Sequence, residues 1–187
     1  MPAIKATPST RDRILDAALD LFVEEGFSGT TISEVERRVG LAAGTGSFYR
    51  HFSSKEALLR AAVEREVATR MAEIEHDRAS LALPDDPRKQ FSTIAEQTLR
   101  DLRRFDRLLR LMLTEGDRVP EIQDAMMTAL PGWGAGSWAD RPSTVVTIAA
   151  LIGYHISDLV GGGVFKDVTQ AAFIEALTAL THGTTQS

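Results

Sequence analysis

Apolar positions recur along most of this chain at the three-to-four-residue spacing of an amphipathic helix. The first such stripe consists of Ile14, Leu15, Ala18, Leu21 and Phe22. Ser9 or Thr10 can cap the start of this helix with a side-chain oxygen. Gly26 follows the stripe, and glycine readily takes the left-handed conformation that ends a helix. The pattern therefore predicts a first helix that ends at Gly26.

A second, shorter helix is predicted after Thr30 or Thr31, and Glu34 stands where a capping box needs its acidic partner. Its buried face would carry Ile32, Val35 and Val39. Residues 40–46 hold three glycines and two alanines, which predicts a turn, and a short aromatic segment follows at 47–52. Short helices joined by tight turns are typical of a helix-turn-helix.

The rest of the chain also has the period of helices. They are expected at 55–76, 91–112, 120–130, 143–160 and 169–181. No segment alternates apolar and polar residues for long enough to predict a strand, so the predicted fold class is all-α. We expect residues 1–54 to form an N-terminal domain and residues 55–187 a helical C-terminal domain, with the helix from about residue 55 linking the two.

The charge of the chain is unevenly distributed. The net charge of -5 and the pI near 5.4 argue mildly against a nucleic-acid partner. Residues 1–60 carry eight basic and eight acidic side chains, so the whole excess of acid lies in residues 61–187. Any contact with DNA is therefore expected in the first third of the chain.

Composition also restricts the kind of chemistry and the compartment. The sequence has no cysteine, which excludes disulfides, thiolate metal sites and a cysteine nucleophile. The N-terminus lacks the apolar core of a secretory signal. The most apolar stretch, 145–160, includes Tyr154, His155 and Asp158 and is too short and polar to span a bilayer. We expect a cytoplasmic protein without a membrane partner.

The most specific signal lies in the first third of the chain. Its segments, in order, are Arg13 to Phe22, Gly26-Phe27, Thr30-Thr31-Ile32, Tyr49-Arg50-His51-Phe52 and Ser54-Lys55-Glu56. Together they resemble the N-terminal domain of the TetR family over residues 10–60. The resemblance implies a helix-turn-helix that binds operator DNA and a helical C-terminal domain that binds a ligand and forms a homodimer. The turn between Gly40 and Tyr49 is about two residues longer than the family pattern, which leaves the choice of base-reading side chains open.

Candidate contacts to the DNA backbone can be named from this resemblance. Thr31 and Lys55 stand at helix N-termini, whose free N–H groups attract phosphate. Tyr49 and His51 can donate to phosphate oxygens, and such contacts fix register. Further phosphate candidates are Arg38, Arg37, Arg11 and Lys5. Arg37 and Arg38 could equally form a solvated helix face.

Candidate base contacts lie in and just before the aromatic segment. They are Thr45, Ser47, Phe48 and Arg50. A hydroxyl serves several bases, an aromatic ring can touch a thymine methyl, and arginine can fork onto guanine. Phe48 and Phe52 could instead belong to the hydrophobic core.

The last two helices are candidates for a dimer interface. The helix at 143–160 is apolar on most of its circumference, so one face needs cover from a partner. The predicted interface residues are Ile152, Ile156, Leu159, Phe173, Leu177 and Leu180. A four-helix interface across a two-fold axis would suit two DNA half-sites. The alternative is a helix buried wholly within its own chain.

An effector pocket is predicted in the C-terminal domain, because large aromatic and methionine side chains suit an apolar ligand. Its candidate lining is Phe91, Phe105, Leu109, Met112, Met126, Trp133 and Trp138, with Tyr154 and His155 as polar anchors. The same side chains at helical spacing could simply form core.

The sequence thus favours a ligand-responsive transcriptional repressor that is released from its operator by a small apolar effector. An alternative is a helical small-molecule-binding or scaffold protein of the same fold that no longer binds DNA. An enzyme is not expected, because no phosphate loop, metal-spaced cluster or activated nucleophile is recognisable. No cofactor and no metal are predicted.

Overall fold

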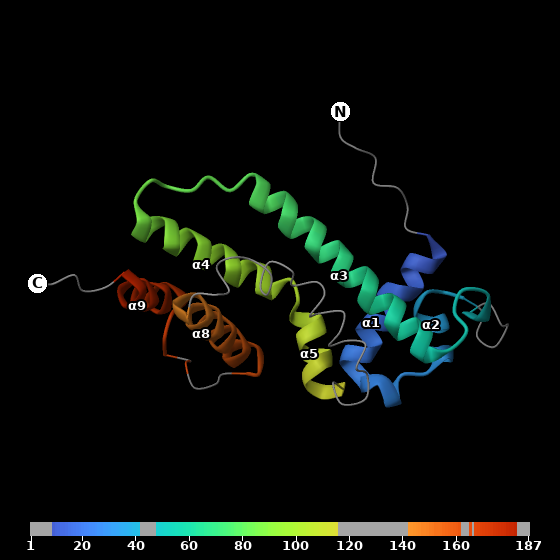
Figure 1. Cartoon of the computed structure of the whole chain (residues 1–187). Helices are drawn as coiled ribbons and strands as arrows, with labels where there is room; N and C mark the ends of the chain where they lie inside the picture. Colours follow the sequence, from blue (N-terminus) through green and yellow to red (C-terminus); the bar gives the residue numbers. More distant parts are fainter. Residues whose placement is uncertain (1–8, 42–47, 116–141, 162–164, 166, 183–187) are drawn as a thin grey trace, which may run out of the picture. The chain divides into compact units, whose positions relative to one another are not determined.

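The computed structural model describes residues 9–41, 48–115, 142–161, 165 and 167–182. Every regular element in these ranges is helical, which confirms the all-α prediction. The elements are α1 (Thr10–Gly29), α2 (Ile32–Arg38), the 3-10 turn η1 (Phe48–Arg50), α3 (Lys55–Ala79), α4 (Pro87–Arg103), α5 (Asp106–Glu115), α8 (Pro142–Leu159) and α9 (Gln170–His182) (Figure 1). The helix expected at 120–130 lies outside the described residues.

The chain divides into two compact units. The N-terminal unit comprises Met1–Thr69 and Arg107–Ala129, and the C-terminal unit comprises Arg70–Asp106 and Leu130–Ser187. Both units therefore share α3, and α5 belongs to the N-terminal unit except for its first residue.

The start of α1 has the cap that the sequence suggested. Ser9 accepts a hydrogen bond from the Asp12 amide at 3.1 Å, and the Asp12 carboxylate completes a capping box. The Ser9 hydroxyl also donates to Asp12 Oδ2 at 2.6 Å, and this bond is the main cause that lowers the pKa of Asp12 below its ordinary value. The predicted apolar stripe of this helix is buried throughout.

Gly26 interrupts α1 at the predicted position. Its backbone is non-helical, with φ of 74° and ψ of 167°, so φ is positive as expected but ψ is extended, and a further helical segment continues to Gly29. The regular part of the first helix thus ends where predicted, and Gly26 forms a kink. Phe22 and Phe27 lie on either side of the kink with ring centroids 5.5 Å apart.

The C-terminal unit is built on α4, which contacts both α8 and α9 (Figure 1). Its core contains Ala95, Leu99, Leu102, Leu151, Ile174 and Leu177. Arg78 and Arg104 form ion pairs with Asp101 and Asp77, which join the end of α3 to α4. These contacts close the unit around one hydrophobic core.

The prediction of a single long helix at 91–112 is wrong. α4 ends at Arg103, and the amides of Arg104 and Phe105 donate to the carbonyls of Asp101 and Leu102, three residues back. This tight turn starts α5 at Asp106. No glycine or proline marks the break, and Phe105 is buried, so the apolar pattern continues across it.

None of the described helices combines the length and the apolar character needed to cross a membrane.

Candidate nucleic-acid interface

The candidate interface is built on a buried aromatic support. Phe48 has no exposed surface and Phe52 is 5% exposed, with ring centroids 5.7 Å apart. The amides of His51 and Phe52 donate to the Phe48 carbonyl at 2.8 and 3.1 Å, which makes the tight turn of η1. Phe48 is therefore a core residue. Its predicted contact with a base does not fit this structure, because its ring is enclosed.

Glu36 holds the start of η1 and was not singled out from the sequence. The residue is 3% exposed, and its Oε1 accepts a hydrogen bond from the Phe48 amide at 3.2 Å. Its backbone carbonyl accepts from Leu41 at 2.8 Å. An acidic residue next to the buried Val35 was the signal available in the sequence. Buried carboxylates of this kind need hydrogen-bond donors, and here one donor is the turn itself.

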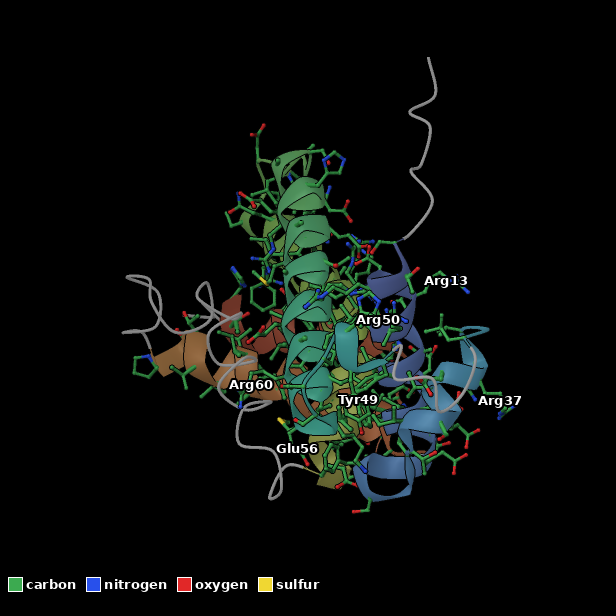
Figure 2. All side chains as sticks on the ribbon, turned by 90° about the vertical axis from the view of Figure 1, so that its right-hand side faces the viewer. Arg13, Arg37, Tyr49, Arg50, Glu56 and Arg60 are labelled. Carbon is green, nitrogen blue, oxygen red and sulfur yellow. The ribbon has the colours of Figure 1, made fainter. Side chains whose placement is uncertain are left out.

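Three consecutive polar side chains project from this support. Tyr49 is 65% exposed, and Arg50 and His51 are also exposed. Figure 2 shows Tyr49 and Arg50 between Arg37 on one side and Arg60 on the other. The Tyr49 ring meets Phe48 edge-on at 5.2 Å, so the buried ring orients the exposed one. Arg50 makes no hydrogen bond or ion pair with another residue in the described part of the chain.

Thr31 has the expected position at the start of α2. Its hydroxyl accepts a hydrogen bond from the Glu34 amide at 3.2 Å, as an N-cap does. The Glu34 carboxylate pairs with Arg37 at 2.5 Å. Thr31 is exposed, so its hydroxyl is also accessible from outside.

Lys55 serves the fold in a way that sequence reasoning missed. Its Nζ donates to the carbonyls of Phe27 and Thr30 at 2.7 and 3.0 Å and lies 4.4 Å from the centroid of the Phe27 ring. The ammonium group thus ties the start of α3 to the end of α1. A phosphate contact by this side chain would have to replace these bonds. The predicted contact with phosphate therefore remains for the backbone N–H groups at the start of α3 and not for the Lys55 ammonium.

Arg38 is also engaged within the chain. Its Nη2 lies 2.9 Å from Glu24 Oε2. This hydrogen bond lowers the pKa of Glu24 and raises the pKa of Arg38. Arg11 lies over the Phe52 ring at 5.0 Å. Thr45, Ser47 and Lys5 are outside the described residues.

Ion pairs fix the helices behind this surface. Arg65 on α3 pairs with Asp16 on α1. Arg107 on α5 lies 2.6 Å from Asp20 and 3.6 Å from Glu66. Glu115, at the end of α5, accepts a hydrogen bond from the Phe27 amide at 3.3 Å, next to the Gly26 kink. The N-terminal unit thus presents a braced surface.

The residues predicted to line an effector pocket do not gather around one described cavity. Phe105 and Leu109 are buried in core, and Met112 is half-buried. The Tyr154 hydroxyl donates to the Val168 carbonyl at 3.0 Å, and the buried His155 lies 2.8 Å from Asp106 Oδ1. Met126, Trp133 and Trp138 fall outside the described residues.

The C-terminal unit instead contains a groove of about 740 Å³, which we call the α4–α8 groove. Among the described residues of the predicted set, Phe91 alone lines this groove. The lining residues are Arg78, Leu81, Leu83, Phe91, Ile94, Gln97, Thr98, Ser143, Thr144, Thr147, Ile148, Leu151, Thr181 and His182. Among the described residues, no group of three or more histidine and acidic side chains is arranged to hold a metal.

The predicted dimer residues fall into two groups. Leu159 and Leu177 are each 6% exposed and belong to the interior of the C-terminal unit, so they offer little surface to a partner. Ile152, Ile156 and Phe173 are half-buried. Leu180 is 82% exposed, and α8 exposes Val145, Val146 and Val160 as well. The exposed apolar side chains of α8 thus lie on a face of the helix that only partly coincides with the predicted interface.

The sequence of this chain is similar to those of known bacterial regulatory proteins. Residues 14–62 match the family model described as bacterial regulatory proteins, tetR family. The chain is 35% identical to an uncharacterized HTH-type transcriptional regulator, YerO of Bacillus subtilis, over 61% of this chain and 38% of that protein. It is 40% identical to the HTH-type transcriptional repressor AcnR of Corynebacterium diphtheriae over 40% of this chain and 38% of that protein. The chain thus covers well under half the length of these relatives.

The fold extends beyond the matched segment. The structure of the multidrug binding protein EbrR complexed with imidazole shares 22% identity, covers 93% of this chain and 96% of that one, and has a TM-score of 0.64. At this level of identity the likeness concerns the fold.

Proposed function

We propose that this chain, whose residues 14–62 belong to the TetR family of bacterial regulatory proteins, is a dimeric DNA-binding transcriptional regulator. The observation that carries the proposal is the exposed run Tyr49-Arg50-His51 on the buried Phe48–Phe52 support. The named relatives are regulators rather than enzymes.

The chemistry of this run suits a DNA duplex. The Tyr49 hydroxyl and the His51 ring can donate to phosphate oxygens, which would fix the register of the protein on the duplex. Arg50 has a planar fork of donors with no partner in the described part of the chain, and this fork matches the O6 and N7 acceptors of guanine. We therefore assign Arg50 to base recognition and its two neighbours to the backbone.

We further propose that the apolar faces of α8 and α9 form the dimer interface. The exposed Val145, Val146 and Val160 on α8 and Leu180 on α9 would be covered by the same face of a second copy. Small side chains on α9, among them Ala172 and Ala176, would let the helices approach closely. A two-fold pair presents two DNA-binding segments, as a palindromic operator requires.

Regulation by a small molecule completes the proposal. A ligand that binds the C-terminal unit better in the DNA-free conformation would lower operator affinity by that difference in affinity and no more. We expect repression in the ligand-free state and release by a predominantly apolar effector.

The proposal is tested by footprinting on the DNA upstream of the gene that encodes this chain. A dimeric regulator protects two related half-sites whose centres are separated by about 10 base pairs or a multiple of that spacing. A Tyr49→Ala variant should stay dimeric and lose protection. If the wild-type chain forms a dimer but protects no DNA sequence, the result would favour the alternative of a binding protein without DNA affinity.

A further inference from the structure

We propose that the α4–α8 groove binds an amphipathic carboxylate, a molecule with an apolar chain that ends in a carboxyl group, and that Arg78 receives the carboxylate. The inference rests on the proposed function, because it assigns the effector of that regulator a site and a chemical class. The groove volume of about 740 Å³ is within the range of small-molecule sites.

Most of the groove wall is apolar. Phe91 and Ile94 contribute from α4, and Ile148 and Leu151 contribute from α8. Ile94 is 46% exposed, which is unusual for a large apolar side chain in a helix that faces its own core. An alkyl chain along this wall would remove the exposed surface from water.

Among the described lining residues, Arg78 is the one arginine or lysine, and none is acidic. Its Nε donates to Asp101 Oδ2 at 3.1 Å, and its Nη2 lies 3.0 Å from the same oxygen. This side-on arrangement leaves Nη1 without a partner in the described part of the chain. The end-on fork of the guanidinium is therefore available for a second carboxylate.

A buried cluster holds that guanidinium in place. Asp101 is 3% exposed at its side chain, and its Oδ1 accepts a hydrogen bond from Gln97 Nε2 at 2.8 Å. The Oε1 of Gln97 in turn accepts from Arg100 Nη2 at 2.9 Å. The cluster of Arg78, Gln97, Arg100 and Asp101 contains two cations and one anion. An anionic ligand balances the extra positive charge, whereas a cationic ligand adds to it.

Of the five hydroxyl groups in the described groove lining, Ser143 and Thr144 lie at the start of α8, and the other three already donate to backbone carbonyls. Thr98 and Thr147 each donate their proton to the carbonyl four residues back, at 2.8 Å, and Thr181 does the same at 2.9 Å. Their oxygens offer lone pairs and their methyl groups add apolar surface. Arg78 is the one permanently charged donor that a ligand meets among the described residues of the groove.

The test compares ligands that differ only in the head group. Decanoate, decanol and decylamine are titrated into the full chain by calorimetry, below the concentrations at which they form micelles. We expect decanoate to bind with a dissociation constant about tenfold lower than that of decanol, as a charge-assisted, forked hydrogen bond provides. Decylamine should bind most weakly. Equal affinities for decanoate and decanol in the wild-type chain would overturn the proposal.

Variants separate the head-group contact from the fold. Arg78→Met should remove the preference for decanoate over decanol, and Arg78→Lys, which keeps a partner for the buried Asp101, should reduce it severalfold because lysine lacks the fork. Ile94→Trp fills the groove and should weaken both ligands. Arg110→Met, an exposed arginine outside the groove, should change neither. A decanoate preference that persists in Arg78→Lys and Arg78→Met would overturn the proposal.

The failure of this inference can be told apart from failure of the regulator assignment. Operator binding is measured on the same samples with and without decanoate. Selective DNA binding by a chain that shows no decanoate preference contradicts only the ligand class. Decanoate binding by a chain that ignores DNA contradicts the regulator and leaves the groove assignment supported.

Discussion

At the scale of single residues, neighbouring aromatic side chains have very different roles. Phe48 is enclosed, while its neighbour Tyr49 is largely exposed. Lys55 appeared from its motif to be a DNA contact, yet its ammonium satisfies two backbone carbonyls at the end of α1. The sequence could place Lys55 at a helix start, but its partners lie 25 and 28 residues away along the chain and only the folded geometry identifies them.

Loss of the Lys55 ammonium should therefore destabilise the N-terminal unit. Lys55→Met leaves the carbonyls of Phe27 and Thr30 without their donor, which should lower the free energy of unfolding by about 1–3 kcal/mol. Denaturant unfolding measures the change. Lys89→Met, at an exposed position on α4, is the matched control and should change stability little. Equal stabilities of the two variants would contradict the structural role.

The Glu24–Arg38 pair makes a prediction about titration. Because the hydrogen bond from Arg38 lowers the pKa of Glu24, an Arg38→Met variant should return that pKa towards its ordinary, higher value. The contribution of the pair to folding is present above the unfolded-state pKa of Glu24 and is lost as the pH falls through the lower, folded-state pKa. Carboxyl NMR titration of both proteins measures the shift. An unchanged Glu24 pKa would show that the pair is absent in solution.

At the scale of elements, periodicity predicted the helices and their buried faces but not their irregularities. The stripe of α1 and its Ser9 cap follow from local rules, since spacing and capping are encoded nearby. The turn at Arg104 and Phe105 carries no glycine or proline, so an uninterrupted helix was the natural prediction. The groove was also unpredictable, because its wall combines residues from α3, α4, α8 and α9 whose proximity is tertiary.

The kink in α1 can be tested through its glycine. Gly26 has φ of 74°, and a Cβ there would come within 2.7 Å of Glu115 Oε1. Gly26→Ala should cost about 1–3 kcal/mol of unfolding free energy from the positive φ alone. Gly29→Ala is the control: it meets only Glu25 Cβ at 3.4 Å in a helical segment, and should be neutral or slightly stabilising. A tolerated Gly26→Ala would mean that the kink is not required.

At the scale of the whole molecule, two units divide the proposed work between DNA and ligand. The exposed apolar face of α8 and α9 is the feature of the C-terminal unit that a single chain leaves unexplained. The sequence pointed to α8 and α9 as the interface but included side chains that lie in the core, because α8 is apolar on several sides and periodicity alone cannot orient it. Leu159 and Leu177, which were predicted to lie at the interface, are buried in the core.

A charge on the exposed face should separate the subunits. Val146 is 64% exposed in the single chain, and Val146→Glu would place two carboxylates near the proposed two-fold axis without disturbing the core. Sedimentation should show a dimer for the wild type and a monomer for the variant. Leu113→Glu, at a 50% exposed position on α5, should stay dimeric. A monomeric wild-type chain, or a variant that dimerises as tightly, would contradict this interface.

Sequence-selective DNA binding is proposed to depend most on Arg50, the side chain assigned to base recognition. Fluorescence anisotropy with the operator and with a scrambled duplex, each over a series of salt concentrations, measures this directly. We predict that Arg50→Ala loses about 1–3 kcal/mol of the discrimination between the two duplexes, whereas Tyr49→Phe weakens both to a similar extent. A wild-type dimer that binds both duplexes equally, or an Arg50→Ala variant that discriminates as well as the wild type, would contradict the account.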